Sequence, residues 1–122
     1  MLDFRKLEVW QKAHAIVLEA YKCSASFPPS ELYGLADQLR RAAVSIPTNI
    51  SEGCGRDTEN ELARFMDIAQ GSAFEVDYLL QLAYDLNYIN EDIYNRLNDK
   101  INQIKKMLFA YGKQVRSNRR KN

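Results

Sequence analysis

Four segments of this 122-residue sequence place their apolar residues at intervals of three and four, the spacing of one face of an α-helix. The segments cover approximately residues 6–26, 30–53, 58–87 and 90–111. No segment alternates as a strand does, and three prolines and five glycines are few for an all-β chain of this length. Long amphipathic helices with short connections predict an all-α fold, an antiparallel up-and-down four-helix bundle.

The first segment carries two adjacent apolar stripes. One stripe comprises Leu7, Trp10, His14, Val17, Leu18 and Tyr21. The other comprises Val9, Ala13, Ile16, Ala20 and Cys23. Because a helix needs only one apolar stripe to join a monomeric bundle, the doubled stripe predicts burial on two sides, either at the centre of the fold or against a neighbouring subunit.

The second segment has predicted start, interruption and stop signals. Ser30 is the expected N-cap, with Glu31 beside the positive end of the helix dipole. Pro47 cannot donate a hydrogen bond to the carbonyl of Ala43, so we expect the second helix to be kinked near Pro47, or to break and restart there. Residues 53–55, Gly-Cys-Gly, supply a glycine for a left-handed helix end.

The third and fourth segments begin with capping residues. Thr58 and Glu61 have the form of a capping box, and Asn90 can cap the fourth helix. The small residues 71–73 in the middle of the third helix predict close approach of another helix backbone. Gly112 offers a stop or a weak point, which divides the chain into a bundle domain of residues 1–112 and a frayed basic tail of residues 113–122. The expected seam of the fourth helix is Ile93, Leu97, Ile101, Ile104, Leu108 and Tyr111.

The charge of the chain is balanced overall and basic at its end. A net charge of +1 gives no global attraction to nucleic acid or membrane. The last ten residues contain five basic side chains and no acidic one, which makes them candidates for contact with nucleic-acid phosphates or an acidic protein surface. The alternative is a solvated terminus that only aids solubility. The candidate nucleic-acid contacts are Lys113, Arg116, Arg119, Arg120 and Lys121.

Few residues are available for catalysis or metal binding. His14 is the only histidine, and it lies on an apolar stripe, which predicts a packed structural role. No Glu-x-x-His motif of a di-iron bundle and no zinc-ligand spacing occurs. Cys23 and Cys54 read as reduced thiols. We therefore expect no enzyme activity, no catalytic residue, no metal, no cofactor and no small-molecule substrate.

Arginines and tyrosines are the remaining candidates for binding. One of Arg40 and Arg41 must lie near the core edge, where Glu52 or Glu75 could pair with it; the alternative is an exposed arginine that binds a ligand. Tyrosine combines apolar area with a polar tip, which favours bundle rims and subunit contacts over base stacking. The tyrosines concerned are Tyr78, Tyr84, Tyr88, Tyr94 and Tyr111.

The sequence indicates a cytoplasmic protein. Charged residues interrupt the first apolar residues, and no apolar run of 18 residues occurs, so we expect neither a signal peptide nor a membrane partner.

Three stretches of the sequence resemble a known family. Residues 35–53, LADQLRRAAVSIPTNISEG, closely resemble the hallmark of the four-helix bundle proteins encoded in 23S ribosomal RNA intervening sequences. Residues 4–13, FRKLEVWQKA, and 69–75, AQGSAFE, are similar to that family in the same order, and Ser51 stands where alanine is common. The motif residues expected to be structural or to form an interface are Gln38, Arg40, Arg41, Ser45, Pro47, Asn49, Glu52, Gly53, Gly71, Ser72 and Glu75.

The resemblance implies a bacterial, cytoplasmic homopentamer around a central channel, with no known activity. A related accessory protein of diversity-generating retroelements is similar in fold and binds nucleic acid and a reverse transcriptase. We therefore expect a non-catalytic oligomer that associates with RNA or a ribonucleoprotein through basic surface residues. The alternative is a scaffold that docks a partner protein and makes no direct contact with nucleic acid.

Overall fold

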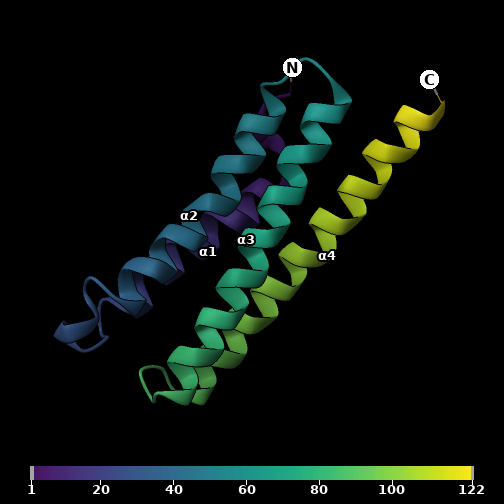
Figure 1. Cartoon of the computed structure of the whole chain (residues 1–122). Coiled ribbons are helices and arrows are strands. Elements are labelled where there is room, and N and C mark those ends of the chain that lie inside the picture. The colour runs from purple at the N-terminus through teal and green to yellow at the C-terminus, as the bar shows by residue number, and fades with distance from the viewer. Residues whose placement is uncertain (1, 122) are drawn as a thin grey trace.

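The computed structural model describes the backbone of residues 2–121 and the side chains of residues 2–117. Four α-helices make up this part of the chain, which contains no strand (Figure 1). The all-α prediction is confirmed. The helices are α1 (Glu8–Ser24), α2 (Leu35–Cys54), α3 (Glu59–Asp85) and α4 (Glu91–Lys121), with short 3-10 turns η1 (Phe4–Lys6) and η2 (Pro29–Glu31).

The helices pack in chain order. Each helix contacts the next one along the chain, and a smaller contact between α1 and α4 closes the arrangement. Figure 1 shows α2, α3 and α4 in alternating directions, which is consistent with an up-and-down bundle. Burial of each large side chain in the core contributes about 1.5–3 kcal/mol to the free energy of folding. The most deeply buried large side chains are Ile16, Leu39, Ile46, Ile50, Met66, Val76, Leu79, Leu80, Leu97, Ile101 and Ile104.

Only one of the two apolar stripes of α1 enters the core. The stripe that contains Ala13 and Ile16 is buried against the other helices. The other stripe lies at the surface: Leu7, Trp10 and Val17 are partly buried against the core, whereas His14 is exposed and Leu18 is 60% exposed. Within a single chain α1 is therefore not at the centre of the fold, and its second stripe has apolar side chains available to a neighbour.

The predicted start of α2 is wrong. Ser30 lies in η2, and α2 begins at Leu35, after Gly34. The carboxylate of Glu31 performs the capping role instead, because its Oε1 accepts a hydrogen bond from the backbone N–H of Leu35 at 3.2 Å. The hydroxyl of Tyr88 donates to the other oxygen, Oε2, at 2.9 Å, so one side chain joins this turn to the α3–α4 connection.

The end of α2 also differs from the prediction. Gly55 follows the last helical residue with φ −88°, and no glycine among the described residues has a positive φ. The helix ends on right-handed turn geometry: the N–H of Gly55 donates to the carbonyl of Glu52, and the N–H of Arg56 donates to that of Gly53.

Pro47 lies inside α2 without dividing it. The helix is continuous through the proline, so the alternative of a break and restart is excluded. Two neighbouring side chains bond to carbonyls one turn back: Thr48 Oγ1 donates to Val44 O, and Asn49 Nδ2 donates to Ser45 O, each at 2.7 Å. A proline and a threonine that bonds back in this way are both established causes of helix bending.

The caps of α3 and α4 are confirmed. Thr58 Oγ1 accepts from the N–H of Glu61 at 3.2 Å, and Asn90 Oδ1 accepts from the N–H of Ile93 at 2.9 Å. The expected close helix approach at Gly71 is wrong for the single chain, because a Cβ added there would have no atom within 4 Å. The next two residues, Ser72 and Ala73, are the ones that pack inwards.

The predicted seam of α4 is confirmed. Its four central residues, Leu97, Ile101, Ile104 and Leu108, are each at most 2% exposed. Gly112 does not stop the helix, which continues to Lys121. The backbone of the predicted tail is helical up to Lys121. Whether residues 1–112 and residues 113–122 behave as separate parts stays a prediction.

Within the described residues, every helix is either too short or too polar to span a lipid bilayer.

Candidate functional site

Polar motif residues of α2 and α3 share one face of the bundle. On α2 they are spaced by three and four residues and so form a single stripe. This stripe meets α3 where Ser45 Oγ lies 2.8 Å from Ser72 Oγ. We call this surface the motif face, and it comprises Gln38, Arg41, Ser45, Asn49, Glu52, Ser72 and Glu75.

The centre of the motif face is a hydrogen-bond network. Asn49 Nδ2 donates to both the carbonyl and the hydroxyl of Ser45, at 2.7 and 3.0 Å. The Ser45 hydroxyl can then donate its own proton to Ser72. Among the described residues no histidine or carboxylate is hydrogen-bonded to either serine, so neither serine has a base that would activate it. The network is suited to joining α2 to α3.

The two motif arginines have different partners from those predicted. Arg41 Nε donates to Asp37 Oδ2 at 2.8 Å across one helical turn, in an exposed ion pair. Arg40 is half-buried: its Nε donates to Ser24 Oγ at 2.7 Å, and its guanidinium lies 4.9 Å from the ring centre of Tyr21. Neither Glu52 nor Glu75 forms an ion pair with them in the described structure. Arg40 lacks a carboxylate partner among the described residues, so its charge is available to an anionic group.

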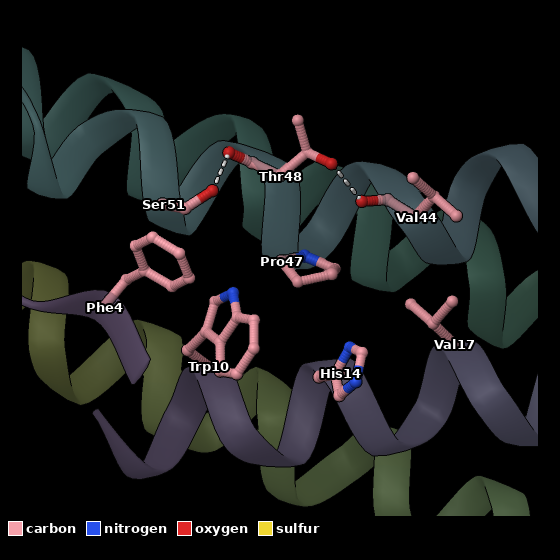
Figure 2. Close-up of a pocket in the computed structure, with 8 residues that line it drawn as sticks. All are labelled: Phe4, Trp10, His14, Val17, Val44, Pro47, Thr48 and Ser51. Atoms are coloured by element: carbon pink, nitrogen blue, oxygen red, sulfur yellow. Dashed lines mark hydrogen bonds between the residues drawn. The ribbon is translucent and has the colours of Figure 1, made fainter. Parts of the chain in front are cut away.

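A groove runs along the contact between α1 and α2. Its first part has a volume of about 290 Å³, and its second part about 600 Å³. Val44 and Thr48 line both parts, so the two form one continuous surface, which we call the α1–α2 groove. Figure 2 shows the first part, lined by Phe4, Trp10, His14, Val17, Val44, Pro47, Thr48 and Ser51.

One wall of the groove is aromatic. The ring of His14 stacks on Trp10 with centroids 5.0 Å apart and planes 6° apart, and Phe4 packs on the other side of Trp10 at 5.0 Å. His14 is exposed, so the prediction of a packed histidine is wrong. The aromatic wall and the methyl groups of Val17 and Val44 make this part of the groove apolar.

The outer side of α3 carries a second exposed apolar surface. Phe74 is 56% exposed and Tyr78 is 63% exposed, with Gly71 one turn before them. The Lys105 ammonium lies over the ring of Phe74, 4.1 Å from its centre, in a cation–π contact. This surface was not predicted, although its residues recur in the sequence at intervals of three and four, out of phase with the core residues of α3. We call it the α3 stripe: Ile68, Gly71, Phe74 and Tyr78, with Glu75 beside them.

The predicted nucleic-acid contacts lie along the last part of α4. Lys113 is exposed. Arg116 Nη2 donates to both carboxylate oxygens of Asp67 at 2.5 Å, so this arginine is tied to α3. The side chains of the other three predicted contacts, Arg119, Arg120 and Lys121, lie outside the described residues. From Lys100 to the end, the sequence has eight lysines and arginines and no acidic residue.

The two thiols are poorly suited to nucleophilic chemistry. Burial, with a smaller effect from the Glu19 carboxylate, raises the pKa of Cys23 to about 11, and burial also raises the pKa of Cys54. Both are therefore thiols at neutral pH, whereas the nucleophile is the thiolate. The described part of the chain has no group of three or more histidine, cysteine or acidic side chains that could hold a metal ion.

Four of the five tyrosines considered above lie at the rims of the bundle. Tyr84 and Tyr94 stack with ring centres 4.8 Å apart, and Tyr94 donates to Gln81 Oε1 at 2.8 Å. Tyr88 and Tyr111 also pack partly buried against the core. Tyr78 differs, because it projects from the α3 stripe.

Comparison with known proteins gives a consistent assignment. The family model described as "23S rRNA-intervening sequence protein" matches residues 5–110, which is most of the chain. A crystal structure from Bacteroides thetaiotaomicron, described as a protein of unknown function from the S23 ribosomal protein family, superposes with a TM-score of 0.78. That protein is 24% identical, and the match covers 86% of this chain and 98% of that one, so it shows a shared fold. No curated protein matches significantly. On the family match, which includes residues 35–53 and 69–75 and all but the first residue of 4–13, this chain belongs to the 23S rRNA-intervening sequence protein family.

Proposed function

We propose that this protein is a non-catalytic, cytoplasmic homo-oligomer, pentameric by family resemblance, that associates with RNA or a ribonucleoprotein through basic surface residues. The main observation in support of this proposal is the charge of α4: after Asp99 every charged residue is a lysine or arginine. These residues follow one helix to Lys121, so their spacing along the backbone is regular. A cationic helix attracts the phosphate backbone irrespective of base sequence.

Assembly supports this proposal because it multiplies a modest charge. A single chain has a net charge of only +1, which gives weak attraction to RNA. Several copies in one assembly would present several basic helices to one RNA, and binding of the first would raise the effective concentration of the rest. The exposed apolar surfaces of α1 and α3 favour such self-association.

The experiment is light scattering coupled to size-exclusion chromatography, with and without total RNA. We expect a particle larger than the 14.1-kDa chain that elutes with RNA at low salt and loses it steeply as salt rises. Changing Arg116, Arg119 and Arg120 to glutamine should abolish RNA association and leave the particle size unchanged. A control that changes Lys6, Lys12 and Lys22 on the α1 side to glutamine removes the same charge and should retain more RNA. Salt-insensitive binding, or none at physiological ionic strength, contradicts the proposal.

A protein-docking scaffold is the second candidate. The connection before α2 exposes Leu32 by 50% and Tyr33 by 91%, which is a surface that a protein partner could cover. A defined partner that is retained from RNase-treated lysate, and lost on Tyr33→Ala, would favour this function over RNA association.

A further inference from the structure

The chain presents two apolar surfaces of opposite shape. The α1–α2 groove is a shallow, open recess, and Trp10, Val17 and Val44 line it. The α3 stripe projects from the helix surface, because Phe74 and Tyr78 are 56% and 63% exposed and no atom of the described chain lies within 4 Å of a Cβ placed on Gly71. A recess placed against a recess leaves voids, and a ridge against a ridge makes little contact. Each surface is therefore a better match for the other than for itself.

Gly71 indicates that the α3 stripe approaches something outside the single chain. Glycine in a helix interior costs about 1 kcal/mol relative to alanine. A Cβ at this position would have no atom of the described chain within 4 Å, so packing inside the chain does not require glycine. Exposed apolar side chains flank it, Ile68 on one side and Phe74 on the other. Close contact by a partner at the centre of the stripe accounts for both features.

The charges of the two surfaces are complementary. The second part of the groove contains Arg40 and Arg41, and only Arg41 has a carboxylate partner there, Asp37. The α3 stripe contains Glu75, which is exposed and has no ion pair among the described residues. A groove with one surplus positive charge thus matches a stripe with one surplus negative charge. Contact between two identical grooves, or between two identical stripes, would instead bring like charges together at a two-fold axis.

We infer that copies of this chain associate head to tail, with the α3 stripe of one copy seated in the α1–α2 groove of the next. This inference rests on the proposed self-assembly and adds which surfaces form the contact. The ring of Phe74 enters the apolar part of the groove against Trp10 and Val44, while Glu75 approaches Arg40. Each copy then uses both surfaces, once as groove and once as stripe, and such head-to-tail contacts form a closed ring when the rotation between successive copies closes.

The test is a mixing experiment with two single variants. Val44→Asp places a charge in the groove and leaves the stripe intact, whereas Phe74→Asp does the reverse. Both side chains are partly exposed, so the fold should tolerate the change. Each variant alone should raise the dissociation constant of self-association roughly 10- to 100-fold and shift light scattering towards the 14.1-kDa monomer. An equimolar mixture should form a complex of two chains, because one intact groove then meets one intact stripe.

Phe109→Asp is the matched control, since it places the same charge on a 68% exposed side chain of α4 outside both surfaces. It should retain wild-type mass, and circular dichroism should show equal helicity for all variants. Thr48→Arg and Tyr78→Arg form a second pair if the first loses helicity. If the wild type associates and folded variant mixtures stay monomeric, the head-to-tail contact is wrong, while proposed self-assembly stands. A wild type that is monomeric at micromolar concentration overturns both.

Discussion

Ser45 on α2 and Ser72 on α3 meet through hydroxyl oxygens 2.8 Å apart, at the centre of the contact between the two helices. Both belong to stretches that resemble the family in sequence, and they are 27 residues apart in the chain. Asn49 donates to Ser45 from one turn further along α2, so the polar cluster contains its own hydrogen-bond partners. Such a cluster requires one register between α2 and α3, because a shift of either helix would leave half-buried hydroxyl groups without partners.

The first prediction concerns this pair. Ser45→Ala and Ser72→Ala should each lower the free energy of unfolding by about 1 kcal/mol, since each leaves the opposite hydroxyl with one partner fewer. The double variant should lose less than the sum of the two. Urea unfolding of the wild type, the two single variants and the double variant, all at one protein concentration, completes this double-mutant cycle. Strictly additive losses would show that the two hydroxyl groups are not coupled.

The second prediction contrasts two helical glycines. A Cβ on Gly53 would lie 3.0 Å from Phe65 Cβ and 3.2 Å from Leu62 Cδ1, whereas one on Gly71 would contact nothing in the chain. Gly53→Ala should therefore destabilise the fold by about 1–3 kcal/mol through crowding of α3.

Gly71→Ala should instead stabilise the subunit by about 0.4–1 kcal/mol through helix propensity. Thermal and urea unfolding in the Phe74→Asp background separate this effect from subunit contact. A destabilised Gly71→Ala subunit in that background would contradict the open environment of Gly71.

The third prediction concerns the ion pair between Arg116 and Asp67. Because Asp67 occupies the guanidinium with two hydrogen bonds, Asp67→Asn should release Arg116 for phosphate and raise RNA affinity. One further phosphate contact should steepen the plot of log affinity against log salt by about 0.7–0.9. Fluorescence anisotropy across a salt series measures both quantities.

Asp57→Asn makes the same change of charge at an exposed residue of the α2–α3 connection and should have a smaller effect. Equal gains from the two variants would mean that net charge alone, not release of Arg116, governs binding.

The fourth prediction concerns alkaline pH. Burial raises the pKa of Cys23 from 9.0 to about 11, so the folded state holds its proton at a pH where the unfolded chain has lost it. The stabilising effect is complete below pH 9 and is lost as pH rises from about 9 to 11, by roughly 2–3 kcal/mol. Urea unfolding at pH 8 and pH 11 should show a smaller loss for Cys23→Ala than for the wild type. An equal loss in both proteins would exclude Cys23 as the cause.

Local signals in the sequence predicted the helices well. The caps at Thr58 and Asn90 depend on a side chain and a backbone N–H three residues away, so the sequence contains both partners. The α4 seam was predictable because its residues repeat at intervals near 3.5. Ser30 misled the prediction because Pro29 starts a 3-10 turn there, and Glu31 then caps α2 from four residues before Leu35.

Side-chain partners were harder to predict, since they depend on tertiary geometry. The exposed position of His14 and the bond from Arg40 to Ser24 follow from how α1 rotates against α2, which periodicity does not determine. Gly71 predicted close approach of another helix, but sequence cannot distinguish a neighbouring helix in the same chain from one outside it. The candidate surface on α4 was predictable in charge, but its pairing with Asp67 was not.

Because α4 continues as a helix past Gly112, the chain would lose less backbone entropy on binding RNA than a disordered tail would. Helix α4 has 31 residues, which corresponds to about 46 Å of rigid rod. A disordered tail would lose about 1–2 kcal/mol of backbone entropy for each residue that became ordered on binding. A basic arm that is already helical avoids most of that loss, and it points in one direction relative to the bundle. In a symmetric assembly all arms would share that angle, so the curvature of an RNA, and not its charge alone, would decide how many arms can reach it.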